Sequence, residues 1–200
     1  MSAPKDYIRD FMSEPVISAK DAALVIIDMQ YATGHRDGAL GRTLKAQGSN
    51  IGDYRFARIE QSVLPRTLDL RAHFHRLGQP VIHVTLGAAL PDATDAPRHM
   101  RKLLASCNNY VGSPDHQILD ALTPVAGEHV LRKTTVGAFA STSIDSLLRA
   151  LREHFKRVGE GVVKELDGLE VHEIAHGIRQ LAYAVADNID VFKIFHVTDG

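Results

Sequence analysis

Apolar residues form two kinds of run along the chain, and each kind predicts a different element. Residues 22–28 and 80–84 are short, nearly continuous apolar runs, and residues 129–133 contain a shorter one, Val130-Leu131. Such runs are typical of strands buried on both faces of a parallel sheet. Residues 59–78 and 144–155 instead carry apolar side chains at helical spacing. The order strand, helix, strand predicts parallel pairing with a right-handed crossover.

The segments between these runs predict loops. Residues 32–52 contain five glycines and many polar residues, which predicts a long loop over the site. Residues 87–116 are interrupted by proline, glycine and aspartate, which predicts irregular structure, and a short helix is expected at 117–122.

The character of the chain changes near residue 152. A charged stretch broken by Gly159 and Gly161 precedes a helical pattern at 171–185 and an apolar run at 191–197 that predicts a strand. We therefore expect an N-terminal arm at 1–20, an α/β domain at 21–151, and a divergent or truncated C-terminal segment of the same domain at 152–200.

Composition restricts the possible partners. With 200 residues, 44% of them apolar, the chain can bury a full core, and a net charge of −1 without a basic block argues against nucleic acid. The charged start lacks the apolar segment of a signal peptide, and no apolar run is long enough to span a bilayer. The glycines form no phosphate-binding pattern. We expect a soluble cytoplasmic protein that acts on a small molecule without a cofactor.

The two strongest candidates for chemistry follow predicted strands. Asp28 ends the first run, and Lys133 ends the third. Ligands of parallel sheets bind where the carboxyl ends of the strands open into a crevice. A carboxylate there can exchange a proton, and a nearby lysine can keep it ionised. Tyr31 and Phe139 lie shortly beyond these positions and are candidates for a pocket wall, with core packing as the alternative.

Residues 22–151 resemble the isochorismatase-like superfamily, also called the cysteine hydrolases. The resemblance rests on residues 22–30, 78–84 and 130–135, together with Ala138-Phe139 and Ser141-Thr142 and the helix after them. It implies a three-layer Rossmann-like fold with a mostly parallel sheet, and a hydrolase of amide, carbamoyl or enol-ether metabolites. It also implies Asp28 as proton shuttle, Lys133 as its electrostatic support, and a homo-oligomer.

The resemblance also implies a nucleophilic cysteine that this chain lacks at the expected place. The one cysteine, Cys107, lies in the predicted irregular region and reads as an ordinary thiol. Three explanations stay open: catalysis without a thiol, a C-terminal segment that abolished activity, or a binding relative that keeps the pocket alone.

A different class of function comes from His172-Glu173-Ile174-Ala175-His176. On a helix these two histidines share a face and could bind zinc while Glu173 activates water. No third ligand stands at a known spacing, so we treat the motif as coincidental and keep a zinc hydrolase as the alternative. His73 and His75 read as surface residues, and His83 as a core histidine.

Overall fold

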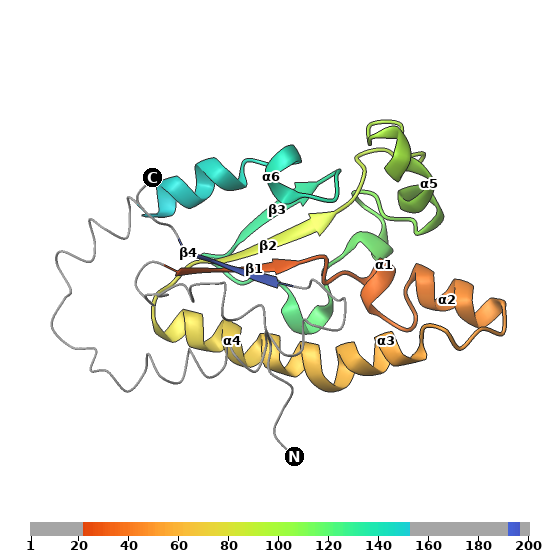
Figure 1. The fold of residues 1–200 in the computed structure, drawn as a ribbon, viewed down its shortest axis with the longest axis horizontal. Helices are drawn as coiled ribbons and strands as arrows, with labels where there is room; N and C mark the ends of the chain where they lie inside the picture. Colours follow the sequence, from red (N-terminus) through yellow and green to blue (C-terminus); the bar gives the residue numbers. More distant parts are fainter. Residues whose placement is uncertain (1–21, 153–191, 197–200) are drawn as a thin grey trace, which may run out of the picture.

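The computed structural model describes residues 22–152 and 192–196, and its centre is a four-stranded sheet (Figure 1). The strands are β1 (Ala22–Ile27), β2 (Val81–Leu86), β3 (His129–Lys133) and β4 (Phe192–His196), in the order β3-β2-β1-β4. β1, β2 and β3 pair in parallel, whereas β4 is antiparallel to β1. The predicted α/β fold with a mostly parallel sheet is confirmed, as is the strand predicted at 191–197.

Helices cover both faces of the sheet, and the two central strands β1 and β2 are buried on both sides. Leu24 and Ile26 of β1 pack against α4 (Leu64–Arg76), which contributes Leu70 and Phe74. Val25 faces the other way, together with Ile82 and Val84 of β2, and contacts the helix at 144–152 through Ile144 and Leu148. The two clusters form the core and fix the strand ends in space.

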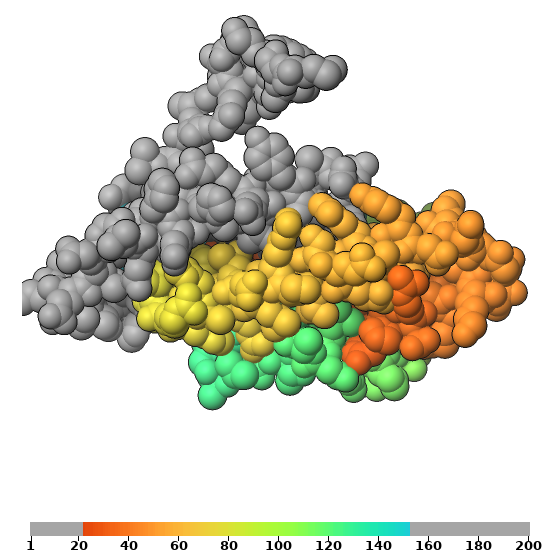
Figure 2. Space-filling model, turned by 90° about the horizontal axis from the view of Figure 1, so that it is seen from below, coloured from red at the N-terminus to blue at the C-terminus, as the bar shows by residue number. Residues whose placement is uncertain are grey.

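The helix predicted at 59–78 is longer than its apolar pattern indicates. It begins with α3 (Asp53–Arg58), continues through the π-helical segment η3 (Ile59–Val63) and ends with α4. Figure 2 shows these elements as a continuous band along one face of the molecule. The chain leaves α4 at Gly78, whose φ of 64° is a left-handed conformation that glycine adopts without strain.

The prediction of a long loop at 32–52 is wrong, because this segment contains α1 (Tyr31–Gly34) and α2 (Ala39–Ala46). Two of its glycines serve close packing. A Cβ atom on Gly38 would lie 1.7 Å from the Tyr31 carbonyl oxygen, and one on Gly41 would lie 1.8 Å from that of Arg36. Glycine is therefore needed where the backbones approach each other, and it does not indicate an irregular segment here.

The irregular structure predicted at 87–116 is also wrong in part. Residues 98–106 form α5 (Arg98–Ser106), which buries Met100 and Leu104 on one face. The short helix predicted at 117–122 is limited to the 3-10 turn η5 (Asp120–Leu122), preceded by another turn, η4 (Pro114–His116). A four-residue helix, α6 (Ala138–Ser141), follows β3.

The arm expected at 1–20 and the helical pattern at 171–185 lie outside the described residues, so the three-part division of the chain stays a prediction. None of the helices within the described residues has the length and apolar character to cross a lipid bilayer.

Candidate active site

Asp28 stands at the carboxyl end of β1, where the chain changes direction. Its backbone N–H donates to the Val84 carbonyl oxygen at 2.9 Å, which continues the pairing of β1 with β2 by one residue. Its φ of 56° lies in the left-handed region, which aspartate tolerates better than most residues. Such backbone conformations are frequent at functional sites, because the surrounding structure must hold them.

Lys133, the last residue of β3, forms an ion pair with Asp28. The Lys133 Nζ lies 2.9 Å from the Asp28 Oδ2, and it also donates to the Val136 carbonyl oxygen at 2.9 Å. The lysine side chain is 5% exposed, whereas 35% of the aspartate side chain is open to solvent. An ammonium has three donors, so one N–H of Lys133 is available beyond these two contacts.

The surroundings of Asp28 shift the pKa of its carboxyl group in two opposite directions. Burial raises the pKa of Asp28 above its ordinary value, and the charges of Lys133 and, less strongly, Arg55 work against that rise. The Oδ1 atom is buried and has no hydrogen-bond partner among the residues that the structure describes. A carboxyl group with a raised pKa and one unsatisfied oxygen is suited to accept and return a proton.

The loop after Lys133 is held together by its own hydroxyl groups. The Ser141 Oγ accepts a hydrogen bond from the Thr134 N–H at 3.2 Å and lies 2.8 Å from the Thr135 Oγ1. The Thr135 hydroxyl donates to the Gly137 carbonyl oxygen at 2.8 Å. These contacts close the loop over residues 134–141 and keep the Val136 carbonyl within reach of Lys133.

A buried glutamine next to Asp28 joins the carboxyl ends of β1 and β2. The Gln30 Oε1 accepts from the Leu86 N–H at 2.8 Å, and its Nε2 donates to the His116 carbonyl oxygen at 2.7 Å. The same Nε2 lies 3.2 Å from the Asn109 Oδ1. The Gln30 backbone N–H donates to the Asp28 carbonyl oxygen at 2.9 Å. Gln30 therefore connects the turn that carries Asp28 to three other segments of the chain.

The two residues predicted to line a pocket lie in different surroundings. Tyr31 packs on the core cluster beneath α4, its ring lies 4.8 Å from that of His35, and a hydrogen bond to Asp120 raises the pKa of its hydroxyl. Phe139 belongs to α6 and is 51% exposed. Their contribution to a substrate pocket stays a prediction.

Cys107 is buried at the end of α5, in a small cluster with Ala32 and Ala39. Burial raises the pKa of its thiol, which disfavours the thiolate that a nucleophilic cysteine needs. These surroundings agree with the expectation of an ordinary buried thiol.

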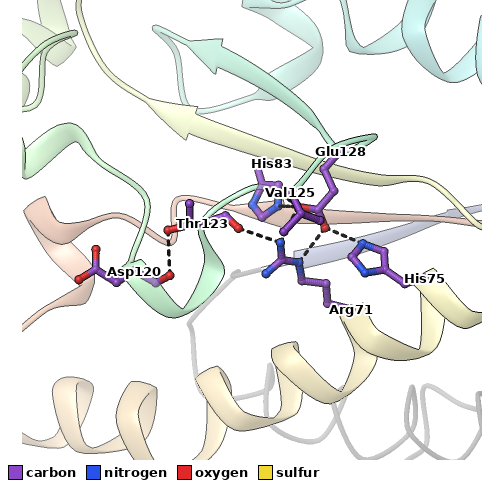
Figure 3. A network of polar contacts seen from close by, with 7 residues as sticks. All are labelled: Arg71, His75, His83, Asp120, Thr123, Val125 and Glu128. Atoms are coloured by element: carbon purple, nitrogen blue, oxygen red, sulfur yellow. Dashed lines mark hydrogen bonds and ion pairs between the residues drawn. The ribbon is translucent and has the colours of Figure 1, made fainter.

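His75 and His83 belong to a polar cluster at the amino end of the sheet, away from Asp28 (Figure 3). His73 is not part of it and contacts Arg76 instead. The Arg71 Nε and Nη2 each donate to one oxygen of the Glu128 carboxylate at 2.7 Å. The His75 Nε2 lies 2.8 Å from the Glu128 Oε1, and the His83 Nε2 lies 3.1 Å from the Oε2. Burial works against its charge, but Arg71, the Val125 N–H and His83 lower the pKa of Glu128 to about 2. The cluster joins α4, β2 and the start of β3. His83 is buried, as expected for a core histidine.

His172, Glu173 and His176 lie outside the described residues. Within the part of the chain that the structure describes, no three histidine, cysteine, aspartate or glutamate side chains are grouped as a metal ion would require.

The sequence predicted a role for Asp28 and Lys133, which the structure brings into contact, but gave none to Gln30 or Arg55. A polar Gln30 between residues that read as buried was a usable signal, because buried amides are retained where they form hydrogen bonds. Nothing in the sequence distinguishes Arg55 from its neighbours Arg58 and Arg66.

Comparison with known proteins gives one family. The model of the isochorismatase domain matches residues 22–154. The ureidoacrylate amidohydrolase RutB of Methylorubrum extorquens is 31% identical over 152 residues, which cover 68% of this chain and 57% of the relative. The enzyme of the same name from Serratia proteamaculans is 30% identical over 149 residues, covering 68% and 56%. The chain thus spans a little over half the length of these curated relatives.

Among solved structures, a cysteine hydrolase from Pseudomonas syringae pv. phaseolicola matches with a TM-score of 0.52 and 22% identity. The match covers 70% of this chain and 61% of that one. This similarity supports the same layered fold.

Proposed function

Because the chain belongs to the isochorismatase family, we propose that it is a hydrolase of small amide, carbamoyl or enol-ether metabolites, with Asp28 as its acid and base. The curated relatives are ureidoacrylate amidohydrolases, which favours C–N bonds as the target. The observation that carries the proposal is the 2.9 Å contact between Asp28 and Lys133 at the carboxyl ends of two strands.

For an amide or carbamoyl substrate, the proposed reaction uses water as the nucleophile. The Asp28 carboxylate takes one proton from water while the water oxygen bonds to the carbonyl carbon. Asp28 then gives that proton to the leaving nitrogen as the C–N bond breaks, which returns the carboxylate to its starting state. The remaining N–H of Lys133 stabilises the negative charge that develops on the carbonyl oxygen. For an enol ether, a protonated Asp28 gives its proton to the terminal carbon of the double bond, and water adds to the oxocarbenium carbon that results. The C–O bond of this hemiketal then breaks to release the alcohol and the carbonyl product, and the proton lost by the water returns to Asp28.

The surroundings of Cys107 favour water over a thiol as the nucleophile. This sulfur is the one thiol of the chain, it is buried at the end of α5, and burial raises its pKa. A thiol in such surroundings is a poor nucleophile.

The buried position of Cys107 also favours a second candidate, a relative that binds its ligand without turning it over. In that case the Asp28–Lys133 pair would form part of a binding site alone. The zinc hydrolase built on His172, Glu173 and His176 is the third candidate, and metal analysis of the purified protein would separate it from the other two.

The experiment is an assay of ammonia release from a panel of primary amides and ureido acids, with isochorismate followed separately by its vinyl-ether cleavage. We expect turnover of at least one C–N substrate by the wild type and a loss of 10²-fold or more in Asp28→Asn, as is typical for removal of a general acid/base. Asp145→Asn is the control, because Asp145 is an exposed carboxylate paired with Arg149. A wild type that binds substrates without product formation would support the second candidate and contradict the first.

A further inference from the structure

Five arginines within residues 22–152 are neutralised by a carboxylate, but the half-buried Arg55 is not. Ion pairs of 4.0 Å or less are formed by Arg36 with Glu60, Arg42 with Asp115, Arg71 with Glu128, Arg132 with Asp95 and Arg149 with Asp145. Arg55 has no such partner among residues 22–152, although its side chain is half-buried. A half-buried guanidinium without an anion is unusual, because taking a charge out of water is unfavourable unless something compensates it.

The Arg55 side chain is fixed against the segment that carries Asp28. Its Nε donates to the Thr33 carbonyl oxygen at 3.1 Å. Thr33 belongs to α1, which begins three residues after Asp28. Figure 1 shows α3 on the same side of the molecule as α1 and the carboxyl end of β1, and this hydrogen bond joins the two helices. This contact uses one of the five N–H donors and leaves the two terminal nitrogens for another ligand.

We propose that the Arg55 guanidinium binds a carboxylate of the substrate, so that the enzyme acts on ureido or amide compounds that carry an acidic group. This inference rests on the proposed hydrolase function and assigns its specificity. The two terminal nitrogens would hold the carboxylate side by side, which fixes the orientation of the substrate as well as binding it.

Electrostatics near Asp28 supports the assignment. Burial lowers the pKa of Arg55, and the negative charge of Asp28 opposes that shift, so the two charges interact. These three groups are two cations, Lys133 and Arg55, and one carboxylate, Asp28, so their charges do not balance. An acidic substrate would restore the charge balance, whereas a neutral amide would leave one cation uncompensated. The curated relatives, named for ureidoacrylate, are named for an acid of this class.

The test measures equilibrium binding in the Asp28→Asn background, where turnover is expected to be slow. The ligands are 3-ureidopropionate and its neutral primary amide, measured by calorimetry. We expect the affinity for the acid to fall roughly 10- to 100-fold in Arg55→Met, the range for a lost hydrogen bond to a charged group, with little change for the amide. Arg55→Lys should lose less, since it keeps the charge without the paired donors.

Arg149→Met serves as the matched control, because its guanidinium belongs to an exposed pair with Asp145. It should bind both ligands like the Asp28→Asn parent. Equal affinity of Arg55→Met and the parent for the acid would overturn the proposal, and so would a parent that prefers the neutral amide or binds neither ligand. If Arg55→Met does not fold, Arg55→Lys decides by the same comparison.

The two sets of measurements distinguish a wrong anion site from a wrong hydrolase function. If the wild type hydrolyses nothing but acid binding depends on Arg55, the hydrolase function is wrong and the anion site stands. If the wild type hydrolyses acidic and neutral substrates equally well, and Arg55→Met does the same, the function stands and the anion site is wrong.

Discussion

The Asp28 carboxylate and the Lys133 ammonium lie 2.9 Å apart although β2 separates their strands in the sheet. Each residue ends or follows a parallel strand at the same edge of the sheet, and each is held by backbone contacts of its own. The pair is therefore positioned by the sheet and the loops that leave it, which makes its geometry insensitive to distant surface changes.

Replacement of the cysteine should leave catalysis intact. Cys107 packs with Ala32 and Ala39, so Cys107→Ala removes a buried sulfur and is expected to cost about 1 kcal/mol of unfolding free energy. Ammonia release should stay within about twofold of the wild type, because the proposed nucleophile is water. Loss of turnover in a variant that still unfolds cooperatively would show that the thiol takes part in the reaction.

Gln30 should be needed for both stability and turnover. Gln30→Met keeps the volume of the side chain but leaves the Leu86 N–H and the His116 carbonyl oxygen without their partner. We expect a loss of about 2–3 kcal/mol, the cost of unsatisfied buried polar groups, and a lower kcat because the turn at Asp28 is no longer fixed. Urea unfolding and initial rates measure the two effects.

The exposed residue Gln47 provides the control for that substitution. Gln47→Met should change neither quantity appreciably. A Gln30→Met protein as stable and as active as Gln47→Met would show that the amide network has no positioning role.

Low pH should reduce the free energy of unfolding, in part because Glu128 becomes protonated. The pKa of this carboxyl is about 2 in the fold, against an ordinary value of 4.5. Since the folded value is the lower one, the contribution is complete above pH 4.5 and is lost as the pH falls toward 2. A shift of this size corresponds to about 3 kcal/mol. Glu128→Gln should therefore be less stable at pH 7, by roughly that amount, and should show a flatter fall in stability between pH 5 and pH 2.

The matched comparison is Glu60→Gln, since Glu60 pairs with Arg36 while 43% of its side chain is exposed. Exposed pairs contribute little, so its stability curve should follow that of the wild type. Identical curves for the two variants would mean that the cluster around Glu128 does not stabilise the fold.

The strands and the Asp28–Lys133 pair could be predicted because their signals are local. A short apolar run ends at Asp28, and the predicted third strand coincides with His129–Lys133. The loop expected at 32–52 failed because Gly38 and Gly41 permit close backbone contact within helical structure. Glycine spacing alone does not separate that use from a flexible loop.

The rest of the candidate site depends on contacts between distant parts of the chain. Gln30 hydrogen-bonds a residue 56 positions away, and Arg55 bonds one 22 positions away. No pattern of period two or 3.6 carries that information. That Arg55 has no carboxylate partner within residues 22–152 is visible only when the positions of the carboxylates around it are known.

A double-mutant cycle on kcat/KM for the best C–N substrate tests the central claim most directly, using Asp28→Asn, Lys133→Met and the combined variant. Residues that act as one unit give strongly non-additive losses. We predict that each single variant loses 10²-fold or more and that the double variant loses little beyond the worse single one. Losses that add, or near-normal rates in either single variant, would contradict the assignment of this pair as the reactive centre.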